Sequence, residues 1–165
     1  MSGASPADRG HRCTPPHAPT RPGRFDESAR RVSWEELTVA QVLVCEGHLV
    51  RALSERPRRG PIADFEVCGV PTEVKTLDPG ASARTLANAL LRGRDQGDVV
   101  IVDASRSGLP RWSAGRGVAL FAARQPLGRV EAVRVLGAGF DLRYDRGQLA
   151  RLATARSPEL GVGIA

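Results

Sequence analysis

A continuous run of β-branched residues, Val99 to Val102, constrains the fold of this chain more than any other feature. The run follows a segment from Ser82 to about Gln96 in which apolar residues recur at helical spacing. A strand with apolar side chains on both faces is typical of a central strand beside a crossover helix. The sequence therefore predicts an α/β fold, with a mixed central sheet flanked by helices.

The segments before this pair predict one helix and three strands. Ser33 and Glu36 form a capping-box pattern, and the apolar residues after them have helical spacing. We therefore expect a helix from Trp34 to about Glu46, ended by Gly47. The strands expected next are 48–53, 63–67 and 71–77, and the last two form a hairpin that turns at Cys68-Gly69.

The two ends of the chain differ in pattern. After the buried strand, the sequence predicts a helix over 112–124, a β-hairpin of strands 130–136 and 140–144, and a short helix over 146–155. Residues 1–31 are rich in proline and show no apolar period, so we expect a disordered basic tail. One domain is expected over 32–157, followed by a flexible C-terminus at 158–165.

Basic residues outnumber acidic ones by 24 to 18, which gives a formal charge of +6 and favours a polyanionic partner. A coding bias toward arginine explains the same excess equally well, because every basic residue except Lys75 is an arginine. Three cysteines without a C-x-x-C pair indicate neither a disulfide framework nor a zinc site. The sequence shows no membrane span or signal peptide, so we expect a cytoplasmic protein, or one delivered by a non-classical route.

The predicted hairpin carries the residues with the clearest chemistry. Glu73 and Lys75 are two residues apart, so they share one face of their strand, and the turn brings Asp64 near their level. Two carboxylates can hold Mg²⁺ or Mn²⁺ together with a substrate phosphate, and a lysine beside them can orient the attacking water. An isolated E-x-K pair is usually a weak surface contact. The placement of the single lysine here favours the functional interpretation.

These residues and their neighbours resemble the PD-(D/E)XK nuclease superfamily, and more narrowly the C-terminal tRNA nuclease domain of CdiA-type contact-dependent growth-inhibition toxins. The resemblance covers roughly residues 34–103 and departs from the motif at Ala63, where the superfamily name has proline. The matching residues are Glu36, Ala40, Leu43, Gly47, His48, Val50, Asp64, Gly69, Glu73, Lys75 and Gln96, followed by the strand from Val99 to Asp103.

The resemblance implies a restriction-endonuclease-like αβββαβ core, extended here by the C-terminal hairpin and helix. It implies metal ligation by Asp64 and Glu73, catalysis by Lys75, and further active-site roles for Glu36 and Gln96. A capping box accounts for Glu36 equally well. The implied substrate is RNA, with tRNA favoured over DNA, and the implied partner of such a toxin is an immunity protein.

Six arginines are candidates for binding the phosphate backbone. They are Arg56, Arg58 and Arg59 in the loop before Asp64, and Arg84, Arg92 and Arg94 on the second predicted helix. Two other functions stay open at this point. One is a non-catalytic nucleic-acid-binding or interaction module that keeps the fold, and the other is a DNA-directed nuclease of repair or restriction type.

Overall fold

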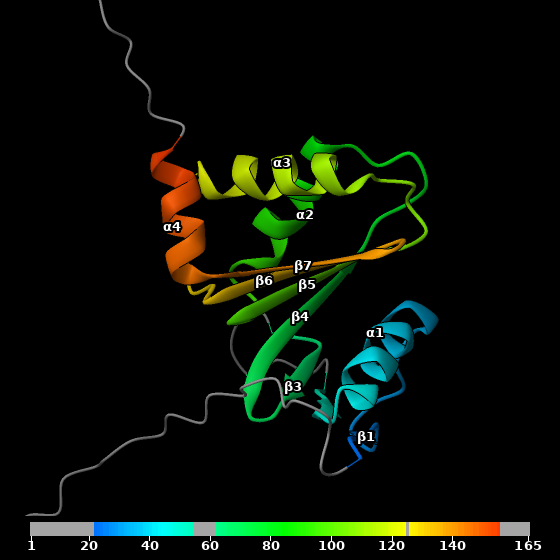
Figure 1. Ribbon diagram of the computed structural model, residues 1–165. Coiled ribbons are helices and arrows are strands. Elements are labelled where there is room, and N and C mark those ends of the chain that lie inside the picture. The colour runs from blue at the N-terminus through cyan, green and yellow to red at the C-terminus, as the bar shows by residue number, and fades with distance from the viewer. Residues whose placement is uncertain (1–21, 55–61, 125, 156–165) are drawn as a thin grey trace, which may run out of the picture.

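The computed structural model describes residues 22–54, 62–124 and 126–155, and these form one mixed sheet with helices on both faces (Figure 1). The strands are β1 (Arg24–Asp26), β2 (Leu49–Ala52), β3 (Phe65–Val67), β4 (Val70–Thr76), β5 (Val99–Ala104), β6 (Ala132–Gly137) and β7 (Phe140–Asp145). The helices are α1 (Trp34–Cys45), α2 (Ala83–Gly93), α3 (Arg111–Ala122) and α4 (Arg146–Thr154). The predicted α/β class is confirmed.

The strands lie side by side in the order of the sequence, from β1 to β7. The pairs β1–β2, β4–β5 and β5–β6 are parallel, and the pairs β2–β3, β3–β4 and β6–β7 are antiparallel. Parallel neighbours require crossover helices, which α2 and α3 supply on either side of β5. The C-terminal hairpin is therefore not an appendage, because β6 extends the sheet beside β5.

Two apolar cores lie on opposite faces of the sheet. Figure 1 shows α2 and α3 on one side of the strands and α1 on the other. Val100 and Val102 belong to the core under α2 and α3, whereas Ile101 belongs to the core under α1. The β-branched run is thus buried on both faces, as predicted.

The hairpin between β3 and β4 turns in two residues. Cys68 and Gly69 have φ values of 50° and 86°, both in the left-handed region that a two-residue type I′ turn requires. This turn fixes a register in which Phe65 pairs with Thr72. Asp64, the residue before β3, therefore comes level with Glu73 on β4.

Ordered structure begins earlier than the sequence predicted. We expected a disordered tail up to residue 31, but β1 pairs with β2 in parallel, and the ring of Phe25 packs edge-on against Phe65 at 6.2 Å. A three-residue edge strand needs only backbone hydrogen bonds and one apolar contact, so it leaves no periodic pattern in the sequence.

Predictions for residues 1–21, the loop at 56–61 and the C-terminus at 158–165 lie outside the described residues. Nowhere in the described ranges is a helix both long enough and apolar enough to cross a membrane.

Candidate active site

Asp64 and Glu73 are held at the point where the β3–β4 hairpin opens. The Asp64 Oδ2 atom accepts a hydrogen bond of 2.9 Å from the backbone N–H of Val74. Glu73 is only 2% exposed and lies beneath the end of α2, where Gly93 makes room for it. A Cβ atom added at Gly93 would lie 3.4 Å from Cγ of Glu73 and 2.9 Å from Val100. The close contact between helix and strand shields this carboxylate from water.

Lys75 lies on the same face as Glu73, as the spacing predicted. Its Nζ atom donates hydrogen bonds to Glu73 Oε1 and, at 3.1 Å, to Gln96 Oε1. Gln96 comes from the turn after α2, so the lysine links β4 to the helix that covers it. The ammonium group is held in place from two sides, and its side chain is still 26% exposed.

The second carboxylate oxygen of Glu73 is the feature of this site that needs explanation. Within the described residues, Glu73 Oε2 is the buried side-chain nitrogen or oxygen that has no hydrogen-bond partner. An unsatisfied buried carboxylate oxygen is costly, because it has lost its water without gaining another donor. A cation at this point would remove that cost, and so would a proton shared with Asp64.

The pKa shifts of the two carboxyl groups agree with this geometry. Burial, together with the charge of Asp64, raises the pKa of Glu73 from 4.5 to about 7, although the Lys75 hydrogen bond opposes the shift. Burial and the charge of Glu36 also raise the pKa of Asp64, against the effect of the Val74 N–H. Both groups are therefore poor anions on their own and would be stabilised as anions by a bound cation.

Arg30 and Glu36 support Asp64 from the α1 side. Glu36 caps α1 through Ser33 in the predicted capping box, and it also accepts two hydrogen bonds from the Arg30 guanidinium, at 2.6 and 2.9 Å. Arg30 Nη2 lies 3.6 Å from Asp64 Oδ1 and donates to the Asp64 carbonyl at 3.3 Å. Burial alone would raise the pKa of Glu36, but the bonds from Arg30 and Ser33 outweigh it and lower the pKa.

The sequence pattern does not point to Arg30, because this residue lies in the segment predicted to be a disordered tail. The only available signal was its position three residues before the capping serine. The carboxylate oxygens of Glu36 accept hydrogen bonds from Arg30 and from the Ser33 N–H. In this geometry Glu36 holds Arg30 in place beside Asp64.

The donor set fits Mg²⁺ or Mn²⁺ better than a closed structural metal site. Among the described residues, no group of three or more His, Cys, Asp or Glu side chains is arranged to hold an ion. Two carboxylates with an unsatisfied oxygen suit an ion that keeps several waters and accepts a phosphate oxygen from a substrate. Asp64 and Glu73 are the residues that could hold it.

No family model matches this chain. No curated protein matches it either. Among solved structures it is similar to a chain of the "CdiA-CT/CdiI toxin and immunity complex from Burkholderia pseudomallei", with a TM-score of 0.47 and 16% sequence identity over 73% of this chain and 98% of that chain. A similarity at this level carries over neither activity nor partner, so function has to be inferred from the site itself.

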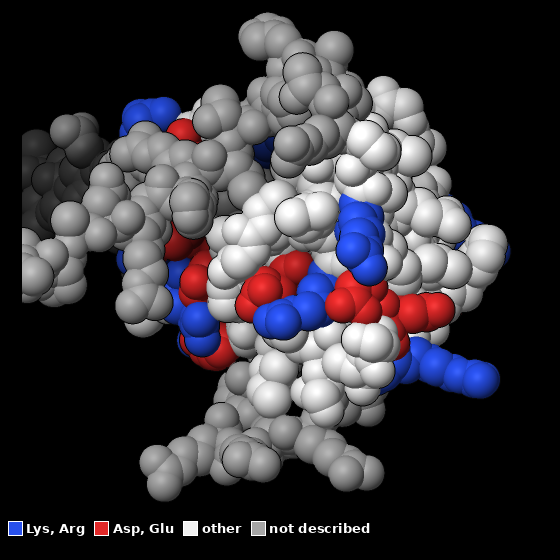
Figure 2. Space-filling model, turned by 90° about the horizontal axis from the view of Figure 1, so that it is seen from below, with Lys and Arg blue, Asp and Glu red and all other residues white. Residues whose placement is uncertain are grey.

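The predicted arginine surface is only partly described. Arg56, Arg58 and Arg59 lie outside the described residues, whereas Arg84 and Arg92 are exposed on α2. Arg94 is hydrogen-bonded to Asp95 and to the carbonyl of Pro126. Figure 2 shows acidic and basic side chains interleaved on one face of the molecule, and no broad basic surface is visible there among the described side chains.

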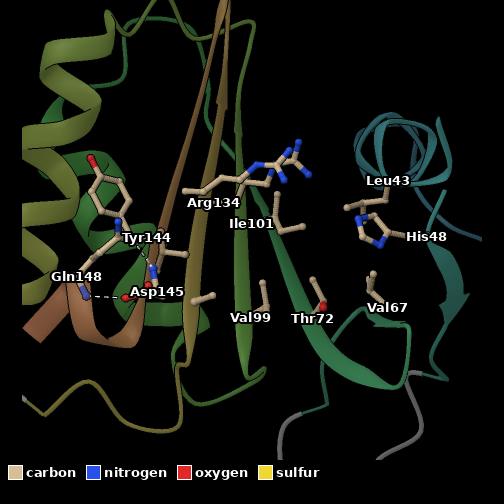
Figure 3. Close-up of a pocket in the computed structure, with 13 residues that line it drawn as sticks. Leu43, His48, Val67, Thr72, Val99, Ile101, Arg134, Tyr144, Asp145 and Gln148 are labelled. Atoms are coloured by element: carbon tan, nitrogen blue, oxygen red, sulfur yellow. Dashed lines mark hydrogen bonds between the residues drawn. The ribbon is translucent and has the colours of Figure 1, made fainter. Parts of the chain in front are cut away.

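A cavity of about 490 Å³ lies away from these residues, over the part of the sheet that α1 leaves uncovered. Leu43, Val99 and Ile101 form its apolar part, and Arg134 lies at its edge (Figure 3). The Arg134 guanidinium is already engaged by Glu46 and Asp141. Neither Asp64, Glu73 nor Lys75 lines this cavity, so its size does not make it the reactive site.

Proposed function

We propose that this chain is a metal-dependent endonuclease that hydrolyses phosphodiester bonds in nucleic acid at Asp64, Glu73 and Lys75. The observation that carries the proposal is the buried and unsatisfied Glu73 Oε2, next to a second carboxylate and a fixed ammonium group. In a purely structural ion pair, buried oxygens are as a rule all hydrogen-bonded. The arrangement suits a site that is completed by a cation.

In this proposal Asp64 and Glu73 hold Mg²⁺ or Mn²⁺. The bound ion would supply a water molecule of lowered pKa and would neutralise charge on the phosphate. Lys75 projects from the strand with its ammonium fixed between Glu73 and Gln96. It can therefore orient a water by hydrogen bonding and place a positive charge beside the phosphate oxygens without reorganising.

Arg30 and Glu36 act on Asp64 in this proposal and not on the substrate. The Arg30 guanidinium donates both to Glu36 and to the Asp64 backbone, which fixes the residue immediately before β3. Asp64 is fixed again by the Val74 N–H. Such support matters because a displacement of about 1 Å in a reacting group can reduce the rate of an enzyme about 100-fold.

We infer RNA as the substrate class, with tRNA as the first RNA to test. This inference is supported by the sequence resemblance of residues 34–103 to the nuclease domains of growth-inhibition toxins. The same resemblance makes a toxin domain, with an inhibitory immunity protein as its partner, part of the proposal.

The test is cleavage of tRNA and of plasmid DNA by the purified chain with Mg²⁺, with Mn²⁺ and with EDTA. Lys75→Ala should reduce the rate at least about 100-fold. Lys75→Arg should not restore it, because the guanidinium fork cannot occupy the place of the ammonium between Glu73 and Gln96. Equal cleavage by the wild type and Lys75→Ala would contradict the catalytic role.

Metal binding can be measured without cleavage, by titration calorimetry with Mn²⁺. Glu73→Gln should abolish the binding isotherm. Glu66→Gln is a matched control, because Glu66 lies on the neighbouring strand β3 and pairs with the exposed Arg51. If the two variants bind Mn²⁺ equally well, Glu73 is not a ligand. Nucleic-acid binding that survives both EDTA and Lys75→Ala, without any cleavage, would instead indicate a binding module.

A further inference from the structure

A smaller cavity, of about 220 Å³, lies beside the first turn of α1, on the face of the sheet opposite to Glu73 and Lys75. It is enclosed by the first turn of α1 and the carboxyl ends of β4 and β5. Glu35 and Thr76 line it, and they adjoin Glu36 and Lys75 in the sequence. Three residues of strand separate Thr76 from Glu73, a distance of about 10 Å. Thr76 faces α1 and Lys75 faces α2, so a nucleic-acid strand that crosses the carboxyl end of β4 would have one nucleotide at the active site and a neighbouring one at this cavity.

Trp34 forms one wall of this cavity. It is the first residue of α1, and 66% of its surface is exposed to solvent. An indole ring exposed beside a cavity is a platform on which a flat ring can stack. Stacking on an aromatic side chain stabilises a bound nucleobase, and it tolerates any base because every base has a flat aromatic face.

Asp103 provides a hydrogen-bond acceptor in the same cavity. It is the next-to-last residue of β5, on the face that carries Ile101, and it is only 5% exposed. One oxygen, Oδ1, accepts a hydrogen bond of 2.9 Å from the backbone N–H of Ser105 and so caps the turn that follows β5. Within the described residues, no hydrogen bond engages Oδ2. Since Glu73 Oε2 is the buried atom without a partner among the described residues, Asp103 Oδ2 retains access to solvent, and a carboxylate oxygen of this kind suits an amino group as donor.

The charges around the cavity decide which part of a nucleotide enters. Glu35, Asp78 and Asp103 are acidic, and Arg106 is basic. A phosphate would be repelled by the three carboxylates, whereas an amino group would be attracted. Arg106 is exposed, so it can pair with a phosphate outside the cavity.

We propose that this cavity binds one unpaired nucleobase with an exocyclic amino group, taken from the strand that is cleaved at the neighbouring site. Trp34 stacks on the base, and Asp103 accepts a hydrogen bond from its amino group. The inference rests on the proposed nuclease function and adds a substrate class to it. The substrate is single-stranded at this nucleotide, or its base is flipped out of a helix.

The two tryptophans of the chain make the proposal testable by fluorescence. Trp112, which is 71% exposed at the start of α3, does not line the cavity and serves as the matched control. In the Trp112→Phe variant only Trp34 fluoresces, and a decamer of cytidine ribonucleotides in EDTA should quench it. In the Trp34→Phe variant, the remaining Trp112 should not be quenched by the same decamer.

Asp103→Asn tests the base preference, because a carboxamide can donate to a carbonyl whereas a carboxylate only accepts. In the Trp112→Phe background, the cytidine decamer should bind at least about tenfold more tightly than a uridine decamer. The added Asp103→Asn change should abolish or reverse that ratio. Free cytidine monophosphate should quench at least about tenfold more weakly than the decamer, because the other nucleotides add backbone contacts.

Several results would overturn the proposal. They are equal quenching of the two tryptophans, no quenching of Trp34, an unchanged base preference in Asp103→Asn, or equal affinity for the mononucleotide and the decamer. The measurement in EDTA needs no catalysis. Normal quenching without cleavage would therefore refute only the nuclease function, and cleavage without quenching would refute only the base site.

Discussion

At the scale of single residues, Glu73 carries a large energetic cost. Its carboxylate is buried, and its pKa is raised from 4.5 to about 7. In the unfolded chain the group ionises near 4.5, so the folded protein holds a proton that the unfolded chain has lost between these two values. Folding stability must therefore fall as the pH rises from about 4.5 to 7 and level off above it.

This cost predicts the effect of Glu73→Gln in metal-free protein. In EDTA the variant should be more stable than the wild type at pH 8, by up to about 3 kcal/mol, because it has no charge to bury. The difference should shrink toward pH 5. Urea denaturation at several pH values measures it, and Glu66→Gln should retain the wild-type pH dependence. A variant less stable than the wild type at pH 8 would contradict the prediction.

Addition of Mn²⁺ should reverse the order of stability. The ion binds the ionised ligands, so its stabilisation of the wild type should increase from pH 6 to pH 8 and be absent in Glu73→Gln. Thermal unfolding with and without Mn²⁺ measures this shift. A shift in the melting temperature that is the same at both pH values would argue against carboxylate ligands with raised pKa.

Arg30 is the second residue with a specific energetic role. Its side chain is 11% exposed and contacts both Glu36 and Asp64. Arg30→Ala should cost about 2–3 kcal/mol, because it leaves two partly buried carboxylates without their counterion. The change in urea midpoint measures the loss. A cost below about 0.5 kcal/mol would show that the contact is not structural.

At the scale of elements, the β3–β4 turn sets the register that aligns Asp64 with Glu73. A Cβ at Gly69 would meet no atom within 4 Å, so a side chain there is opposed only by the backbone conformation. Gly69→Val should cost about 1–2 kcal/mol, whereas Cys68→Asn should be neutral or slightly stabilising, because asparagine favours the left-handed region. Thermal denaturation compares the two. If both cost the same, the turn does not control the register.

The sequence predicted those elements whose signals are local. Three elements were predicted from a few adjacent residues each, and the structure contains all three. They are the helix after the capping box at Ser33, the two-residue turn at Cys68-Gly69 and the strand that begins at Val99. The contact of Lys75 with Glu73 followed from the strand period, whereas a place for Gln96 in the site was implied only by the family resemblance. Strand β1, the contact of Arg30 with Asp64 and the cavity beside Trp34 depend on pairings between distant segments. Nothing in the local pattern encodes these pairings.

At the scale of the whole molecule, an ion-pair network links two distant parts of the chain. Arg134 on β6 is 7% exposed and donates to Asp141 and to Glu46 at the end of α1, and Arg143 pairs with the same two acids. Arg134→Ala should lower stability by about 2–3 kcal/mol, since Arg143 still compensates part of the charge. Because the network lies at the opposite end of α1 from Glu36, Mn²⁺ affinity should not change. If Arg134→Ala lowered both the stability and the Mn²⁺ affinity, the ion-pair network and the metal site would be coupled.

The short strand β1 also matters for how this protein is expressed. A boundary chosen from the sequence pattern would start the recombinant chain at residue 32, which removes β1 and Arg30 while keeping both proposed metal ligands and Lys75. Such a product could fold around α1 and still bind Mn²⁺ weakly, so its inactivity would be misread as evidence about the chemistry. A start at residue 22 retains the strand, the guanidinium and the support of Asp64.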